Sequence, residues 1–179
     1  MKQPNTALDL DALFDAAGES IGAAFPDLVL VEDYPEDRRA LPTPCCLLEL
    51  IDLEPTDDPG TGQLAAVATM QARLLISFRE PRAKRRVAKL AADVAHHVMG
   101  QRWGLPVEPA RLTMIAVDDF DPELDRFEVW AVEWRQTIHI GASIWDDDGT
   151  PPTQVLASWS PDVGADHQGD YTDIGEATA

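Results

Sequence analysis

Two long segments of the chain alternate between apolar and polar side chains. In residues 64–78 the apolar side chains fall on one side of an extended chain and polar ones such as Thr69 on the other. Residues 127–140 repeat the alternation, with Trp130 and Trp134 on the apolar side. A period of two residues is that of a β-strand with one buried face. The pattern therefore predicts two long strands in an antiparallel sheet that is covered on one side.

Two other segments space their apolar side chains three or four residues apart, as the buried face of an α-helix requires. They are residues 8–25, which Asp9 caps, and residues 82–99, which Gly100 closes. Both are long enough to cover much of a sheet with their apolar faces. We expect them to be the two main helices of the fold.

Shorter apolar runs predict the remaining strands. Residues 45–53 are almost continuously apolar, which indicates a strand buried on both faces, and residues 112–117 form another. The elements then run helix, strands, helix, strands. This order is typical of an α+β fold, with one mostly antiparallel (mixed) sheet flanked by two main helices.

Near the C-terminal end the sequence becomes rich in acidic residues, glycine and proline. Residues 146–149 read Asp-Asp-Asp-Gly, and Pro151 and Pro152 follow. Such residues interrupt regular structure, and few apolar residues lie beyond them. We therefore expect a single α+β domain over 1–141 and an extended acidic C-terminal arm with a mobile tail over 142–179.

The net charge of the chain argues against two functional classes. Thirty-two Asp and Glu residues against 14 Lys and Arg give a net charge of −18. A protein that coats nucleic acid or docks on an anionic membrane needs a basic surface, so neither class is expected. The two cysteines, Cys45 and Cys46, are adjacent and form no disulfide framework, which favours a reducing compartment.

The basic residues are segregated. Residues 79–102 hold seven of the 14 basic residues and two acidic ones, a net charge of +5 that leaves −23 for the rest of the chain. Such a segment could be a solvated helix face, and contact with DNA is disfavoured by the acidity of the rest of the chain. The sharper interpretation is a head-to-tail contact, in which the basic helix of one copy meets an acidic surface of the next. Contacts of this kind form rings when the rotation closes. The residues expected to contribute are Arg82, Arg85, Arg86 and Lys89.

The positions of two tryptophans also favour a contact between subunits. Trp145 and Trp159 lie in the acidic, Pro-containing C-terminal segment rather than in a predicted helix or long strand. Aromatic side chains on such a segment suit a groove on a partner. We therefore add both to the expected subunit interface.

The residues that could act in catalysis lack neighbouring groups that would complete a catalytic or metal site. Asp118, Asp119 and Asp121 stand in a turn with no His or Lys nearby, and only a bound divalent metal there would give a hydrolase or nuclease. His96 and His97 are adjacent on a helix and point about 100° apart, which does not suit one metal ion. We expect no enzyme, no catalytic or cofactor-binding residue, no cofactor and no metal site. The metal-dependent hydrolase or nuclease stays as a distant alternative.

One block of sequence between residues 133 and 164 resembles small proteins encoded among the tail genes of Mu-like transposable phages and prophages. The residues that carry the resemblance are Glu133-Trp134-Arg135-Gln136-Thr137-Ile138, Gly141, Ile144-Trp145, Pro151-Pro152 and Ser160-Pro161-Asp162-Val163-Gly164. The order of predicted elements is also similar to that of tail terminator proteins of long-tailed phages.

The resemblance implies a structural protein of the virion. Tail terminators form a hexameric ring that caps the tail tube, stops its polymerisation and presents a face to the head. The implied partners are other copies of the chain, the tail tube protein and a head-side connector protein, with genomic DNA only passing through the pore and no membrane. The implied location is the tail or neck of the virion, and the host cytoplasm during assembly.

Two other functions stay open at this stage. A head–tail connector or tail completion protein would have the same general build and charge. A small regulatory protein that binds a basic partner through its acidic surface would also fit the composition.

Overall fold

The two alternating segments form the centre of a five-stranded sheet. Strand β3 (Leu64–Ser77) pairs with β5 (Phe127–Ile140) along its whole length, antiparallel, with Met70 opposite Trp134. The sheet order is β1-β2-β3-β5-β4, where the three outer strands are β1 (Leu30–Asp33), β2 (Cys45–Pro55) and β4 (Arg111–Val117). Strand β1 runs parallel to β2 and the other pairs are antiparallel. The predicted mixed, mostly antiparallel sheet is confirmed.

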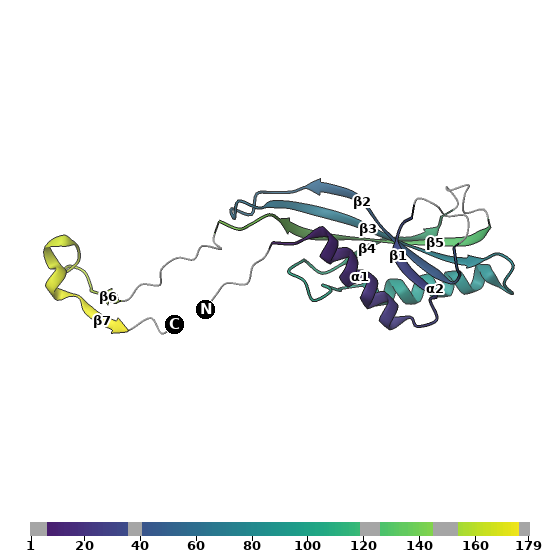
Figure 1. Ribbon diagram of the computed structural model, residues 1–179. Helices are drawn as coiled ribbons and strands as arrows, with labels where there is room; N and C mark the ends of the chain where they lie inside the picture. The colour runs from purple at the N-terminus through teal and green to yellow at the C-terminus, as the bar shows by residue number, and fades with distance from the viewer. Residues whose placement is uncertain (1–6, 36–40, 119–125, 145–153, 176–179) are drawn as a thin grey trace. The chain divides into compact units, whose positions relative to one another are not determined.

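The computed structural model describes residues 7–35, 41–118, 126–144 and 154–175 (Figure 1). These belong to two compact units, one within residues 5–144 and the other within residues 145–179. The five-stranded sheet and two long helices make up the first unit, and a small two-stranded sheet lies in the second.

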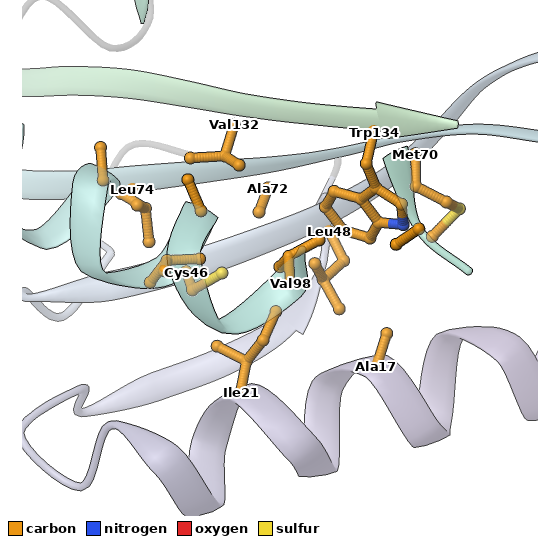
Figure 2. Packing of buried hydrophobic residues seen from close by; sticks show 14 of the residues in the cluster. Ala17, Ile21, Cys46, Leu48, Met70, Ala72, Leu74, Val98, Val132 and Trp134 are labelled. Atoms are coloured by element: carbon orange, nitrogen blue, oxygen red, sulfur yellow. The ribbon is translucent and has the colours of Figure 1, made fainter. Parts of the chain in front are cut away.

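Helices α1 (Leu10–Ala24) and α2 (Ala83–Val98) lie on the same side of the five-stranded sheet (Figure 1). Their buried residues, including Ile21 and Val98, join the even-numbered residues of β3 from Ala66 to Ile76 in one core cluster. Trp134 is fully buried in this cluster, between Met70 and Leu48 (Figure 2). The class is therefore α+β, with a helical layer on one face of the sheet.

The opposite face of the sheet has a smaller apolar cluster. Cys45, Leu47, Leu75 and Val129 form it at one end of the sheet, with Tyr34 packed against them. Farther along the same face most side chains are polar, among them Arg73, Gln71 and Glu133. This half-covered arrangement explains why the long strands alternate so regularly.

The prediction that residues 45–53 are buried on both faces is wrong for the second half of that segment. Only Cys45–Leu48 are buried throughout, whereas Ile51 is 42% exposed and Leu53 is 36% exposed. The pairing of β2 with β3 shifts register between Leu50 and Asp52. The helix-covered core ends at Leu50 on this strand, so the apolar pattern continues beyond the layer that covers it.

The second unit contains more regular structure than the sequence predicted. Strands β6 (Val155–Ala157) and β7 (Thr172–Gly175) pair antiparallel, and a 3₁₀ helix, η2 (Ala165–Asp170), connects them. Residues 165–175 were expected in a mobile tail, and they form η2 and β7 instead. None of the side chains described within residues 154–174 is buried.

Candidate interaction surface

The predicted contact residues on α2 are all exposed, and three of them stand at its start. Arg82 is the N-cap with φ of 61°, in the left-handed region, and its side chain caps no backbone N–H. Arg85 and Arg86 follow in the first turns, and the first turn holds no acidic residue. Cations are unfavourable at the positive end of the helix dipole. An acidic partner would offset this unfavourable charge.

Two of these four cations are paired with acidic residues within the chain. Arg86 pairs with Glu80, and Lys89 Nζ lies 2.6 Å from Asp93 Oδ2. Arg82 and Arg85 form no ion pair with any described residue. Exposed pairs of this kind contribute only about 0–1 kcal/mol. The surface of α2 is therefore basic and open to a partner.

A hollow of about 310 Å³ lies between the end of α1 and the exposed side of α2. We call it the α1–α2 groove. Arg86, Lys89, Asp27 and Asp93 provide its charged side chains. Its apolar lining is Phe25, Pro26, Leu28, Pro44, Ile76 and Leu90. No sequence pattern predicts this groove, because its lining comes from four separate parts of the chain.

The second unit carries exposed apolar side chains. Trp159 is 87% exposed. The backbone around it is held in place by hydrogen bonds from Ser158 Oγ to the carbonyl of Asp162 and from the Gly164 N–H to Tyr171 Oη. The neighbouring exposed apolar residues are Val155, Leu156, Val163 and Ile174. Trp145, the other tryptophan predicted to reach a partner, lies outside the described residues.

The structure gathers one set of metal-ligating side chains that the sequence analysis did not single out. Ligand atoms of Asp162, His167 and Asp170 all lie within 4.8 Å of one another. His167 Nδ1 is 3.0 Å from Asp170 Oδ2, so these two already form a local pair three residues apart. The i, i+3 spacing could have revealed that pair, but Asp162 joins it only through the fold.

Of the three aspartates considered for a hydrolase, only Asp118 lies among the described residues. Asp118 Oδ2 accepts a hydrogen bond of 2.7 Å from Arg73 Nε, and Arg73 also bonds Glu49 and stacks on Tyr34. Burial alone would lower the Arg73 pKa, but the hydrogen bonds that Arg73 donates to the carboxylates of Asp118 and Glu49 outweigh burial and raise that pKa. The Asp118 carboxylate is thus held by a permanent cation. Asp119 and Asp121 lie outside the described residues.

The two thiols are buried packing groups, as the sequence predicted. Burial, with a smaller contribution from Glu32, raises the pKa of Cys45 to about 12. Burial also raises the pKa of Cys46, and the neighbouring Cys45 adds to the effect. A thiol that holds its proton at neutral pH is a poor nucleophile and a poor metal ligand.

The adjacent histidines diverge as expected. His96 is exposed, whereas His97 is partly buried. His97 Nε2 lies 2.9 Å from Ser20 Oγ, and its ring meets Phe25 edge-on. These contacts join α2 to α1 beside the α1–α2 groove.

A scan against protein-family models and a search of curated proteins both find no match to this chain. Within the described residues, no helix is long and apolar enough to cross a membrane.

Proposed function

We propose that this chain is a structural assembly protein of a phage tail. It acts as a terminator whose copies form a ring, of six subunits by the resemblance, that caps the tail tube and joins it to the head-side connector. The observation that carries the proposal is the basic start of α2 on a chain with a net charge of −18. The block within residues 133–164 supports the phage-tail assignment by its resemblance alone.

The charge distribution suits controlled self-assembly. A net charge of −18 keeps free subunits apart and soluble. The basic surface of α2 gives each copy one place where an acidic neighbour is attracted, and complementary charge sets the orientation of such a contact. Because the two sides of this contact differ, its repetition gives a ring when the rotation between neighbours closes. The acidic remainder of the chain would repel the phosphates of DNA that passes through the pore.

Electron microscopy of particles made without the protein tests this function. A phage that encodes the chain is propagated with the gene deleted, and the same lysates are prepared with the gene restored on a plasmid. We expect tails of excess and variable length without the protein and tails of uniform length after restoration.

Other particle types would contradict the terminator function. Tails of normal length beside unjoined heads would identify a head–tail connector or tail completion protein. Intact, infectious particles would exclude both assembly functions.

A further inference from the structure

We propose that Trp159 of one copy inserts into the α1–α2 groove of a second copy of this chain. This inference rests on the proposed assembly function and names the two surfaces that would meet in it. The C-terminal unit would then be the connecting element between neighbouring subunits.

The dimensions of the groove suit an indole ring. An apolar cavity of about 150 Å³ accommodates one benzene ring. The α1–α2 groove has about 310 Å³, and Phe25, Leu28 and Leu90 are among its apolar lining residues. It therefore has room for the two fused rings of a tryptophan.

The described residues of the C-terminal unit form no buried core. Trp159 is 87% exposed and Ile174 is 64% exposed, and no side chain described within residues 154–174 is buried. Units this small rarely hold together without a disulfide, a metal or a partner. Burial of Trp159 against a second copy would supply the missing apolar contact.

The charges on the two surfaces are complementary. After Arg135 the chain has no Lys or Arg and eight Asp or Glu residues. Asp162 lies three residues beyond Trp159 and is exposed. Arg86 and Lys89 line the groove, and each is already paired with an acidic residue of the same chain. The excess positive charge comes from Arg82 and Arg85 on the same helix, which form no ion pair with any described residue. An inserted Trp159 would bring an acidic segment to this net basic helix.

The decisive test mixes two variants of the full chain. Trp159→Ala retains an intact groove, and Arg86→Glu combined with Leu90→Glu retains an intact Trp159. Sedimentation velocity should show that each variant alone stays monomeric, whereas the wild-type chain forms rings. An equimolar mixture should form a 1:1 heterodimer and no larger species, because only one complementary junction remains. Insertion within one chain predicts monomers in the mixture, which would overturn the proposal.

Controls separate this inference from the proposed function. Ile174→Ala removes another exposed apolar side chain of the same unit and should leave assembly intact. Trp159→Ala should raise the dissociation constant of the subunit contact by about 30-fold or more, as loss of a central aromatic contact does. Rings that persist in Trp159→Ala would overturn this inference and leave the ring function standing. A wild-type chain that never assembles, and does not affect tail length, would overturn the proposed function.

Discussion

At the scale of single residues, Gln136 is a polar side chain bonded on every side within the apolar face of β5. Its Oε1 accepts hydrogen bonds from the indole N–H groups of Trp103 at 2.7 Å and Trp134 at 3.1 Å. Its Nε2 donates to the carbonyls of Gln101 and Glu108. Gln136→Leu leaves these groups without partners, and each such buried group costs about 1–3 kcal/mol. We expect the free energy of unfolding in urea to fall by about 3 kcal/mol.

Gln71 provides a matched control on the neighbouring strand. Gln71 is 6% exposed and Gln136 is 1% exposed, so both side chains are buried. The Gln71 Oε1, however, has no hydrogen-bond partner among the described residues. Gln71→Leu removes an unsatisfied buried oxygen, so the unfolding free energy should stay within about 0.5 kcal/mol of wild type or rise. Equal losses in the two variants would show that hydrogen bonding is not the cause.

At the scale of secondary-structure elements, the sequence predicted the long elements whose apolar residues recur regularly along the whole segment. The expected strand over 127–140 matches β5, and the expected helix over 82–99 matches α2 to within one residue at each end. The parallel pairing of β1 with β2 was not predicted. It depends on Leu30 and Tyr34 packing against Leu47 and Leu75, which are tertiary contacts that a four-residue run does not encode.

The candidate surface was predictable only in part, for the same reason. The density of cations on α2 is visible in the sequence, and their exposure is confirmed. The groove beside them requires Pro44, Ile76 and Leu90 to meet, and these residues are far apart along the chain. The Asp162, His167 and Asp170 group likewise requires the fold of the second unit.

The charge of α2 should matter more for assembly than for folding. Replacing Arg85, Arg86 and Lys89 by Glu should abolish ring formation, because the basic side of the contact becomes acidic. The unfolding free energy should stay within about 1 kcal/mol of wild type, because acidic residues suit the start of a helix while the exposed Arg86–Glu80 and Lys89–Asp93 pairs are lost. Light scattering after gel filtration measures the assembly, and urea unfolding measures the stability.

A second triple variant controls for net charge. Arg102, Arg111 and Arg126 are also exposed, and their replacement by Glu changes the charge of the chain by the same amount. Ring formation should survive in this control. If both triple variants lose the ring equally, the total charge matters and the position on α2 does not.

At the scale of the whole molecule, the net charge of −18 and the basic surface of α2 respond to salt in opposite ways. Electrostatic forces extend about 30 Å at 0.01 M salt, about 8 Å at 0.15 M and about 3 Å at 1 M. At the lowest salt, whole subunits repel one another before the contact forms. At 0.15 M this repulsion is screened while close charge pairs still attract, and at 1 M those pairs weaken too. We therefore expect the ring fraction in sedimentation velocity to be highest near 0.15 M. A steady rise up to 1 M would indicate an apolar contact that needs no charge, and a steady fall from 0.01 M would show that subunit repulsion does not oppose assembly.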